Sequence, residues 1–533
     1  MTVEEVAKEN AAIAKEYKDL LKISYRRLSA QDKKLIRKAF DVAVDAHSDQ
    51  RRKSGEAYIF HPIAVAKIVA SEIGLDATSI AAALLHDVVE DCPRYSIEDI
   101  QQLFGETVAR IVNGLTKISS LNKDMNVSMQ AENFRKMLLT LHDDIRVIII
   151  KIADRLHNMQ TIHSMREDKQ LKIASETLYI YAPLAHKIGL YNIKSKLEDL
   201  ALKYTEPEVY NDILVKLEES KEDQDLYIKD ISKVLTKALN KEKIKYVIKG
   251  RPKSIFSIRR KIQKQGVSFD EVYDKFAVRI IYKSELKDEK FLAWKIYSIV
   301  TDHFRPNPTR LRDWISAPKS TGYEALHITV MGPKGRWVEV QIRSERMNEI
   351  AEKGYAAHYK YKQGEGEKEH DANLESWIGK LQEVIENPES SAVEFVEQFK
   401  LNLYAKEIFV FTPNGDLKSL PKDATPLDFS FSIHTEIGMK TRGAKVNGKL
   451  VPLNHVLQSG DQVDIITSES AKPTSNWLDY VTTTRAKSKI KSSLKEDKKI
   501  IAKDGKEILR RKLKQLKITL NERTINELVN YFK

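Results

Sequence analysis

The sequence predicts a multidomain protein: an all-α domain, an α/β domain, a small β-rich domain and a basic helical C-terminal segment. Three observations lead to this prediction. The chain has 533 residues, a length typical of roughly three to four domains. Apolar residues recur at helical spacing up to about residue 200, and short strands alternate with helices from residue 244. Turn signals and further strands then cluster between residues 405 and 468.

The first two domains differ in their apolar periodicity. Residues 1–200 carry helical patterns such as Ile80, Leu84 and Val88, and residues 201–243 form a charged, helical connector. Residues 244–365 contain the expected strands 245–249, 276–282, 325–331 and 337–343. A Gly-, Glu- and Lys-rich loop at 363–370 then leads into a helical linker over 366–404.

The last third of the chain begins with a predicted β domain at 405–468. A strand at 408–411 is followed by the turn sequence TPNG (412–415), and VNGK (446–449) indicates a second hairpin. Residues 469–533 become helical and basic after Trp477. Segment 481–533 holds 16 Lys and Arg against 6 Asp and Glu, which is +10 of the net +13. Such a tail either faces a phosphate backbone or is a soluble lysine-rich helix, and composition favours neither.

Composition narrows the class of protein. Hydrophobic residues make up 42% of the chain, which is enough for packed cores. No apolar run reaches the roughly 18 residues that a membrane span needs, and the acidic first ten residues do not resemble a signal peptide. Cys92 is the only cysteine. Internal disulfides and thiolate zinc sites are therefore excluded, and we expect a cytoplasmic protein without a membrane partner.

The predicted helical domain contains a constellation of metal-ligand type. His61, His86, Asp87 and Asp154 offer imidazole nitrogens and carboxylate oxygens, which suit manganese or zinc. Segment 80–90 has no helix breaker, so we expect His86, Asp87, Glu90 and Asp91 on one edge of one helix, the last two orienting a bound water. Arg52 and Lys53 could hold phosphates. The alternative is a solvated acidic helix face with a core histidine.

The predicted α/β domain contains a phosphate-handling constellation. Gly250–Ser254 follows a strand and opens a helix to about Gln265, so a helix N-terminus meets a cluster of cations. These cations are Arg251, Lys253, Arg259, Arg260 and Lys261. Asp274 precedes one strand, and Glu339 lies on the polar face of another with Gln341 and Arg343. We expect magnesium-assisted phosphoryl transfer, with Asp274 and Glu339 as magnesium ligands or base. The alternative is a half-exposed antiparallel strand.

Three strings in the helical domain carry a resemblance to a known family. RRKSGEAYIFHP (51–62), HDVVED (86–91) and ADRLHNM (153–159) resemble the HD superfamily of metal-dependent phosphohydrolases, and within it the RelA/SpoT homologues. The long members of that family synthesise and hydrolyse the alarmones pppGpp and ppGpp. The resemblance implies a manganese-dependent hydrolase in which Glu90 and Asp91 are catalytic. It places the nucleotide-binding residues at Arg52, Lys53, Ser54, Asn158 and Thr161.

The strings KSTGYEALH (319–327) and AEKGYAAH (351–358) resemble the family's synthetase domain, which is similar to nucleotidyltransferases. The resemblance implies transfer of pyrophosphate from ATP to the 3′-hydroxyl of GDP or GTP. It implies ATP contacts at Arg251, Lys253, Ser257, Lys261 and Arg279. It implies acceptor contacts at Lys319, Tyr323, which would stack on guanine, His327 and Gln341. Asp274 would bind Mg²⁺ and Glu339 would deprotonate the acceptor hydroxyl. RLRD (310–313) keeps the basic charge of the string that marks bifunctional members.

PLDFSFSIHT (426–435) resembles a TGS domain, a β-grasp module, and the segment after Arg485 resembles the start of the family's helical domain. The resemblance implies contact of His434 with deacylated tRNA on the ribosome. The family normally continues through a zinc-finger-like or RNA-recognition-like domain and an ACT domain, so we expect either a truncated or a naturally short form. We also expect reciprocal control of the two activities through the connector. The alternatives are that only one site is active, or that both folds only sense nucleotides in an RNA-binding regulator.

Overall fold

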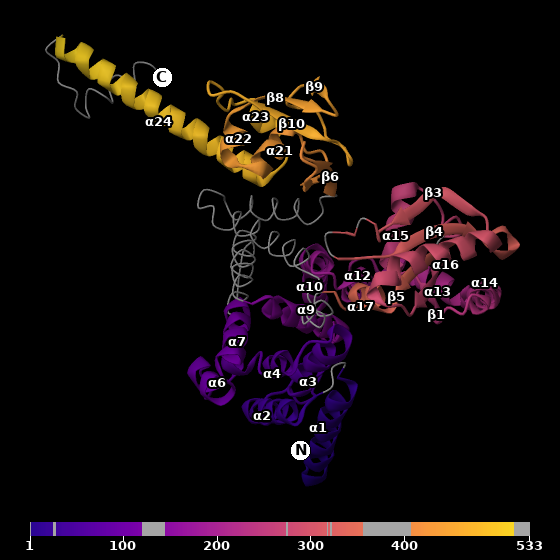
Figure 1. The fold of residues 1–533 in the computed structure, drawn as a ribbon. Helices are drawn as coiled ribbons and strands as arrows, with labels where there is room; N and C mark the ends of the chain where they lie inside the picture. Colours follow the sequence, from indigo (N-terminus) through magenta and orange to yellow (C-terminus); the bar gives the residue numbers. More distant parts are fainter. Residues whose placement is uncertain are drawn as a thin grey trace. The chain divides into compact units, whose positions relative to one another are not determined.

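The computed structural model describes residues 2–24, 28–119, 144–272, 275–316, 318–319, 322–354 and 407–515. The chain divides into two compact units, Met1–Ile385 and Glu386–Lys533. Figure 1 shows helices in the first half of the first unit, a sheet with helices in its second half, and a small β domain with one long helix in the second unit.

The described residues up to about 205 are helical, as the apolar spacing predicts. Capping boxes start several of these helices: Thr2 with Glu5, Ser29 with Asp32, and Ser96 with Asp99 each satisfy free backbone N–H groups. The α-helices are α1 (Val3–Ile23), α2 (Ala30–Ala46), α3 (Phe60–Lys67), α4 (Ala77–Leu84), α5 (Val88–Asp91), α6 (Ile97–Phe104), α7 (Glu106–Ser119), α9 (Ile145–Gln160), α10 (Glu167–Glu176), α11 (Ala182–Lys187) and α12 (Tyr191–Thr205). Two π-helical stretches, η1 (Ile68–Ile73) and η4 (Thr177–Tyr181), and one short 3-10 helix, η3 (Ile162–Ser164), lie between them.

A five-stranded sheet follows, in the order β1-β2-β5-β4-β3. Strands β2 and β5 are parallel, and the other neighbours are antiparallel. The strands are β1 (Tyr246–Pro252), β2 (Phe276–Tyr282), β3 (Pro306–Asp313), β4 (Leu326–Met331) and β5 (Trp337–Ser344). The helices of this region are α13 (Pro207–Glu219), α14 (Lys221–Lys241), α15 (Ile255–Gln265), α16 (Glu289–His303) and α17 (Glu345–Lys353), with turns η5 (Leu286–Asp288) and η6 (Pro333–Gly335).

One face of the sheet is apolar and is covered by helices α14 and α16. Val340 and Ile342 on β5 pack there with Ile231 and Leu235 of α14 and with Ile296 of α16, all fully buried. Helix α14 lies within the predicted connector, so that segment also supplies part of the core of the sheet. The opposite face carries Glu339, Gln341 and Arg343, as the alternation predicts.

Three local features of this region differ from the predictions or from an alternative that the sequence left open. Strand β1 runs on to Pro252, which pairs with Phe276, so Pro252 lies in the strand and not at the helix start. Strand β3 was not predicted, because it is an edge strand of mostly polar, exposed residues with a bulge between Asn307 and Arg312. Strand β5 is no half-exposed antiparallel strand: it is the central strand, and six of its eight residues are buried.

The second unit contains a two-stranded and a three-stranded sheet packed on short helices. The strands are β6 (Glu407–Phe411), β7 (Leu417–Pro421), β8 (Thr441–Val446), β9 (Lys449–Val451) and β10 (Val463–Thr467), and the helices are α21 (Pro426–Ile433), α22 (Thr435–Met439), α23 (Trp477–Tyr480) and α24 (Thr484–Gln515). The VNGK hairpin prediction is confirmed: β8 and β9 pair across Asn447 and Gly448, both at positive φ.

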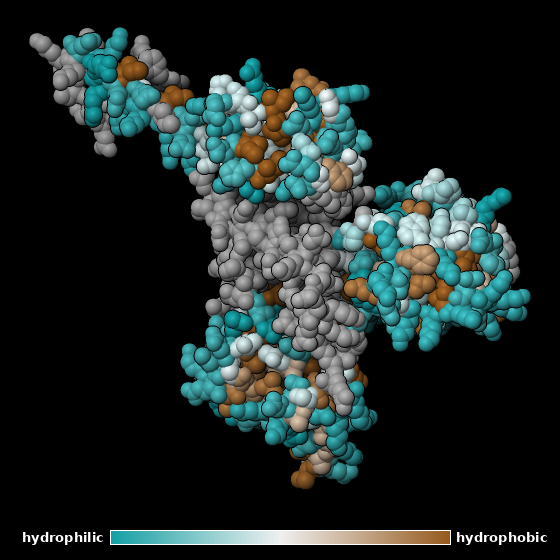
Figure 2. Space-filling view, viewed as in Figure 1, coloured by the Kyte–Doolittle hydropathy of each residue, from teal (hydrophilic) through white to brown (hydrophobic). Residues whose placement is uncertain are grey.

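Buried Asp428 joins the small domain to helix α24. Its carboxylate accepts hydrogen bonds from the backbone N–H of Thr425, Thr482 and Thr483, the last at 2.7 Å. Helix α24 continues as a basic helix, and Figure 2 shows a mainly hydrophilic surface along it. The predicted loop at 363–370 and linker at 366–404 lie outside the described residues.

Candidate functional sites

Four predicted metal ligands come together in the helical region. His61 lies in the first turn of α3, His86 and Asp87 lie between α4 and α5, and Asp154 lies in the middle of α9. All four are buried, and His61, His86 and Asp154 each place a ligand atom within 4.8 Å of the others. His61 Nε2 lies 3.2 Å from Asp154 Oδ1 and 3.7 Å from Asp87 Oδ2. Residues 93 positions apart in sequence thus form one polar centre.

The expected continuous helix over 80–90 is wrong. Helix α4 ends at Leu84, and the next helix, α5, begins at Val88. The backbone N–H of Leu85 is shared between the carbonyls of Ala81 and Ala82, so the last turn tightens and the chain leaves the helix. His86 and Asp87 therefore project from a turn, where adjacent residues can reach one centre without helical spacing.

The ring nitrogens of the two ligand histidines are fixed by their other contacts. His86 Nδ1 lies 2.8 Å from the Ala83 carbonyl and must donate to it, so Nε2 faces the carboxylates. His61 Nδ1 lies 2.8 Å from His157 Nδ1, which leaves His61 Nε2 toward the same carboxylates. Burial, together with the charges of His61 and Arg52, lowers the pKa of His157 to about 3, so His157 is a neutral acceptor. Such outer contacts are typical of metal-ligating histidines.

The carboxylates are also anchored by groups that sequence reasoning missed. Tyr58 donates its hydroxyl to Asp87 Oδ2 at 2.7 Å, and Lys151 Nζ lies 2.8 Å from Asp154 Oδ2. Burial alone would raise the pKa of Asp154, but the charge of Lys151 and the proximity of His61 outweigh it and hold that pKa well below its usual value. The i,i+3 spacing of Lys151 and Asp154 on a helix was the one signal that could have found Lys151.

This arrangement fits a divalent transition metal. Two imidazole nitrogens and two carboxylates converge, and the buried His86 Nε2 has no hydrogen bond of normal geometry that would occupy its lone pair. The donor types exclude neither manganese nor zinc. A cation at this centre would offset the charge of the two carboxylates.

The other predicted hydrolase residues differ in how close they lie to the four metal ligands. Arg52 reaches Asn158 Oδ1 at 3.3 Å, and Asn158 Nδ2 donates to Asp154 Oδ1 at 2.7 Å, so these two reach the ligand set. Thr161 ends α9 and bonds the His157 carbonyl. Four further predicted residues lie at the surface or near it: Lys53 and Ser54 are exposed on a turn, while half-buried Glu90 and exposed Asp91 end the short helix α5.

On the sheet, strand register sets polar residues side by side. Across five strands, Lys249 pairs with Arg279, Arg279 with Gln341, Gln341 with His327, and His327 with Arg312. The row therefore combines several basic side chains with one amide on the face opposite the apolar core. Lys249 and Arg312 were not predicted as site residues. A face of this composition suits an anionic ligand.

A second group of side chains on this face, the acceptor cluster, consists of the four predicted acceptor residues together with Glu339. Gln341 Nε2 donates to Glu339 Oε1 at 2.7 Å, and His327 Nδ1 lies 3.4 Å from the same oxygen. The Tyr323 hydroxyl lies 2.7 Å from His327 Nε2, and Lys319 Nζ lies 5.0 Å from the centroid of the Tyr323 ring. Burial lowers the pKa of His327 to about 4, despite the opposing charge of Glu339. A neutral His327 can accept from Tyr323 through Nε2 and donate from Nδ1 to Glu339.

The predicted ATP residues lie on β1, β2 and α15. Arg279 is buried and pairs with Glu352 of α17 at 2.8 Å, and Arg251 acts electrostatically on both. Ser257 lies in the first turn of α15, Lys261 in its middle, and Lys253 between β1 and α15. Asp274 lies outside the described residues.

The N-terminus of α15 differs from the open anion site that was expected. Ser254 caps it by accepting from Ser257 N, and Asp199 of α12 accepts from Phe256 N at 2.8 Å. Burial raises the pKa of Asp199 to about 6, although backbone hydrogen bonds from Phe256 and Ile255 oppose the shift. The protein thus supplies its own carboxylate at this helix end.

Residues from the helical region also touch the acceptor cluster. The Tyr191 ring, at the start of α12, makes an edge contact with the Tyr323 ring at 5.6 Å between centroids. Gly354 approaches the backbone at Gly189 so closely that an added Cβ would lie 2.6 Å from the Gly189 carbonyl carbon. Lys353 Nζ donates to the Ser71 carbonyl at 2.8 Å. Tyr191 therefore forms part of the surroundings of the acceptor cluster, while Gly189 and Ser71 contact the end of α17.

Three family models match this chain. An HD domain covers residues 39–191, the region found in RelA/SpoT proteins covers residues 250–366, and a TGS domain covers residues 408–467. The chain is 43% identical over 495 residues to the guanosine-3′,5′-bis(diphosphate) 3′-pyrophosphohydrolase of Aquifex aeolicus. The aligned residues cover 92% of this chain and 69% of that protein.

The chain belongs to the RelA/SpoT family. It is also 40% identical over 497 residues to the GTP pyrophosphokinase of Myxococcus xanthus, with 92% of this chain and 64% of that protein covered. The bifunctional (p)ppGpp synthase/hydrolase SpoT of Escherichia coli is 40% identical over 467 residues, with 87% and 65% covered. The chain thus spans about two thirds of the length of these relatives. The predicted fold class is confirmed: an HD domain, the α/β region found in RelA/SpoT proteins and a TGS domain follow one another.

In the TGS domain of this RelA/SpoT protein, His434 is exposed at the start of α22. Its Nδ1 accepts a hydrogen bond from the backbone N–H of Glu436 at 3.2 Å, so it caps that short helix. In the part of the chain that the structure describes, no helix is both long and apolar enough to cross a bilayer.

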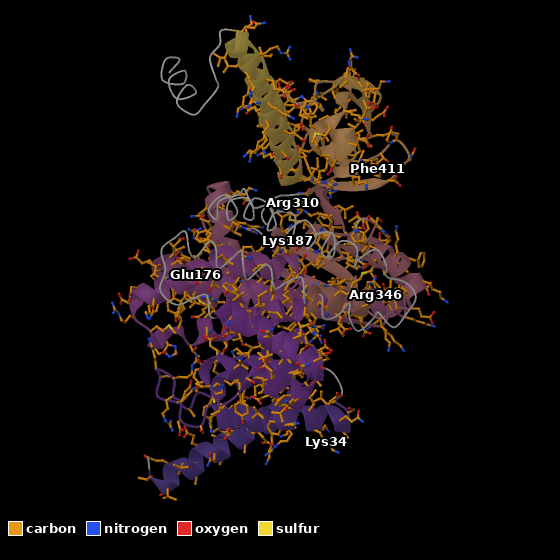
Figure 3. All side chains as sticks on the ribbon, turned by 90° about the vertical axis from the view of Figure 1, so that its left-hand side faces the viewer. Lys34, Glu176, Lys187, Arg310, Arg346 and Phe411 are labelled. Atoms are coloured by element: carbon orange, nitrogen blue, oxygen red, sulfur yellow. The ribbon has the colours of Figure 1, made fainter. Side chains whose placement is uncertain are left out.

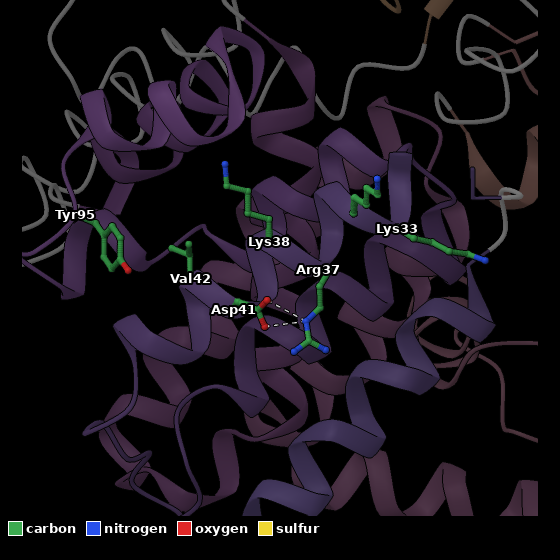
Figure 4. A pocket seen from close by; sticks show the side chains of 7 residues that line it. Lys33, Arg37, Lys38, Asp41, Val42 and Tyr95 are labelled. Carbon is green, nitrogen blue, oxygen red and sulfur yellow. Dashed lines mark hydrogen bonds and ion pairs between the residues drawn. The ribbon is translucent and has the colours of Figure 1, made fainter. Parts of the chain in front are cut away.

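A groove of about 550 Å³ lies elsewhere, on the HD domain. Its walls come from α2 and from Tyr95, and Figure 4 shows Lys38 and Arg37 along it, with Arg37 paired to Asp41. None of the metal-centre residues lines it, so it is separate from the candidate site.

Proposed function

We propose that this protein is a bifunctional (p)ppGpp synthetase and hydrolase of the bacterial stringent response. One site would transfer pyrophosphate from ATP to the 3′-hydroxyl of GDP or GTP, and the HD site would hydrolyse (p)ppGpp to GDP or GTP and pyrophosphate. The observation that carries the proposal is that one chain holds two separate polar centres. One is of metal-ligand type at His61, His86, Asp87 and Asp154, and the other combines cations with Glu339. The names of the relatives support both reactions.

At the hydrolase site, the four ligands would hold Mn²⁺. The metal would supply Lewis-acid activation of water and of the phosphate. Arg52, aimed at Asn158, is placed to bind a phosphate of the alarmone, and Lys53, Ser54 and Thr161 would bind the nucleotide with it. Glu90 and Asp91, on the helix that follows the ligand pair, would orient the attacking water and accept its proton.

At the synthetase site, Glu339 would accept the proton of the acceptor hydroxyl. Gln341 holds one Glu339 oxygen and His327 lies beside it, which orients the carboxylate before the acceptor binds. Tyr323 would stack on guanine, with Lys319 near the acceptor. Arg251, Lys253, Ser257, Lys261 and Arg279 would bind ATP, whose negative charge needs many cations. Mg²⁺ would use Asp274 and Glu339.

The direct test is to assay the purified chain for both reactions. Incubation with ATP, GDP and Mg²⁺ should yield ppGpp, and incubation of ppGpp with Mn²⁺ should yield GDP and pyrophosphate. Turnover in only one assay would reduce the chain to a one-way enzyme. Nucleotide binding without turnover in either assay would favour an RNA-binding regulator that senses nucleotides.

We further propose that the two activities are reciprocally controlled. The contacts of Tyr191 with Tyr323 and of Gly189 with Gly354 support this, because they link the end of the HD domain to the acceptor cluster and to the end of α17. They favour α12 and the segment before it as the route, more than the connector at 205–243. The TGS domain and basic α24 support binding of deacylated tRNA on the ribosome, and a cytoplasmic location fits all of these partners.

A further inference from the structure

Arg343 lies on the polar face of the five-stranded sheet. It is the most completely buried large side chain of that face, with no exposed surface. Its Nε and Nη1 make no hydrogen bond to any described residue. Its Nη2 lies 3.4 Å from Gln341 Oε1, a long contact to a neutral amide. A buried guanidinium without a carboxylate is costly, because water is removed and nothing replaces it.

A neighbouring arginine shows how this chain pairs a partly buried guanidinium with carboxylates when the arginine has a structural role. Arg346, labelled in Figure 3, follows three residues later and is only partly buried. It makes two ion pairs, with Glu289 and Glu324, at 2.7 and 2.8 Å. These carboxylates raise its pKa although burial opposes them. Arg343 has no such partner among the described residues, and burial lowers its pKa to about 10.

The surroundings of Arg343 are cationic. Arg279, on the adjacent strand β2, also leaves Nε and Nη2 without a hydrogen bond to a described residue. Arg279 pairs with Glu352, and the charges of Arg251, Arg279 and Glu352 all act on Arg343. Three guanidinium groups thus share one carboxylate. Two of them are buried with unused donors, which is the arrangement expected around an anion that binds later.

We propose that Arg343 is a phosphate-binding residue of the synthetase site, where its guanidinium and that of Arg279 grip one phosphate group of a bound nucleotide. The inference rests on the proposed function. It adds to that site a phosphate-binding residue that the sequence motifs did not assign. The ligand chemistry is a nucleotide phosphate, from either the donor ATP or the acceptor GDP. A merely structural role remains the competing explanation, because the Arg343 guanidinium lies 5.9 Å from the Tyr323 ring centroid and could support that ring.

The test compares the full chain with Arg343→Met, Arg343→Lys and the control Arg336→Met. Arg336 is exposed in the same domain and pairs with Asp223, so its replacement removes the same charge outside the site. The probes are a non-hydrolysable ATP analogue, GDP and pyrophosphate, each titrated calorimetrically, and thermal unfolding is followed with and without each probe.

We expect Arg343→Met to bind one of the two nucleotides about 10- to 100-fold more weakly, as loss of charge-assisted hydrogen bonds implies. The nucleotide affected identifies the source of the phosphate. Arg343→Lys should keep an intermediate affinity, Arg336→Met should match the wild type, and the Tm of unliganded Arg343→Met should stay equal or rise. Pyrophosphate should raise the Tm of the wild type and of Arg336→Met but not of Arg343→Met.

Unchanged affinity of Arg343→Met for all three probes would overturn the inference. A lower unliganded Tm, rescued by Arg343→Lys together with full affinity, would instead show a structural role and also overturn it. These results are distinct from failure of the proposed function, in which the wild type itself forms no ppGpp. The pyrophosphate comparison between wild type and Arg343→Met still decides the inference in that case.

Discussion

At the scale of single residues, both ligand histidines are oriented by contacts made on their other ring nitrogen. His86 is tied to a backbone carbonyl, whereas His61 depends on a second histidine, His157, at 2.8 Å. Because His157 is neutral at physiological pH, it accepts the proton of His61 Nδ1 and leaves Nε2 free for a metal. We therefore expect His157 to act as a positioning residue of the candidate metal centre.

Replacing His157 with Ala should weaken Mn²⁺ binding about 10- to 100-fold, because outer contacts of metal ligands carry effects of this size. The measurement is the Mn²⁺ concentration that gives half-maximal ppGpp hydrolysis. His163→Ala, at an exposed position just beyond α9, is the matched control and should behave as the wild type. Equal Mn²⁺ dependence in the two variants would contradict the positioning role.

The ligand set was predictable because its residues sit in short, specific strings, whereas their supports were not. Tyr58 and His157 reach Asp87 and His61 from positions 29 and 96 residues away. No local pattern encodes such contacts, since they depend on how α3, α5 and α9 pack. Arg343 was visible as a polar strand residue, but its burial and unused donors appear only in the fold.

At the scale of elements, most helices and four of the five sheet strands follow from apolar periodicity. The misses have physical causes. Helix α4 stops at Leu84 without a glycine or proline: the Leu85 N–H is shared between two carbonyls of the last turn, and His86 Nδ1 bonds a third, that of Ala83. Edge strand β3 has no apolar alternation to detect. The N-terminus of α15 is capped by Asp199, which lies 57 residues earlier in the chain.

Asp199 makes a prediction about stability and pH. Its folded pKa of about 6 lies above the roughly 3.9 of an unfolded aspartate. The folded state therefore binds the proton more tightly, so its stabilising contribution is complete below pH 4 and is lost as pH rises through 6. Asp199→Asn cannot ionise, yet keeps an oxygen that accepts from Phe256 N.

We expect the wild type to lose about 2 kcal/mol of unfolding free energy relative to Asp199→Asn between pH 4 and 7. Urea denaturation at several pH values measures the difference. The exposed Asp212→Asn on α13 should show no such trend relative to the wild type. A difference that is constant with pH would show that Asp199 does not titrate in this range.

Helix α24 carries a second prediction at this scale. Its basic, exposed surface should contribute to tRNA affinity by releasing counterions, so binding should weaken steeply with salt. Deleting residues 481–533 should lower tRNA affinity and flatten its dependence on log salt concentration. Fluorescence anisotropy with labelled deacylated tRNA measures both quantities. An unchanged slope after the deletion would remove the helix from the proposed interface.

At the scale of the whole molecule, the HD domain and the synthetase region meet at the aromatic pair Tyr191 and Tyr323. Tyr323 is held by this contact, by His327 and by the ammonium of Lys319 near its ring. Stacking on guanine would require these neighbours to rearrange. The contact is therefore suited to oppose synthesis from the HD side, and energetic coupling of this kind must be reciprocal for ligand binding.

Tyr191→Ala should lower the Kd for GDP severalfold, because one contact that holds Tyr323 is lost. The same variant should show a smaller effect of bound ppGpp on GDP affinity. Tyr179→Ala, at an exposed position of the same region, is the control. An unaltered Kd for GDP and an unaltered response to ppGpp in Tyr191→Ala would exclude this contact as the route of control.

The central claim is that two independent sites in one chain catalyse opposing reactions. The most direct test is to measure both reactions in Asp87→Ala and in Glu339→Gln, since each change removes a group from one centre only. We predict that Asp87→Ala loses ppGpp hydrolysis and still forms ppGpp from ATP and GDP, while Glu339→Gln does the converse. If either variant lost both reactions while remaining folded, or if neither lost turnover, the assignment of two separate sites would be contradicted.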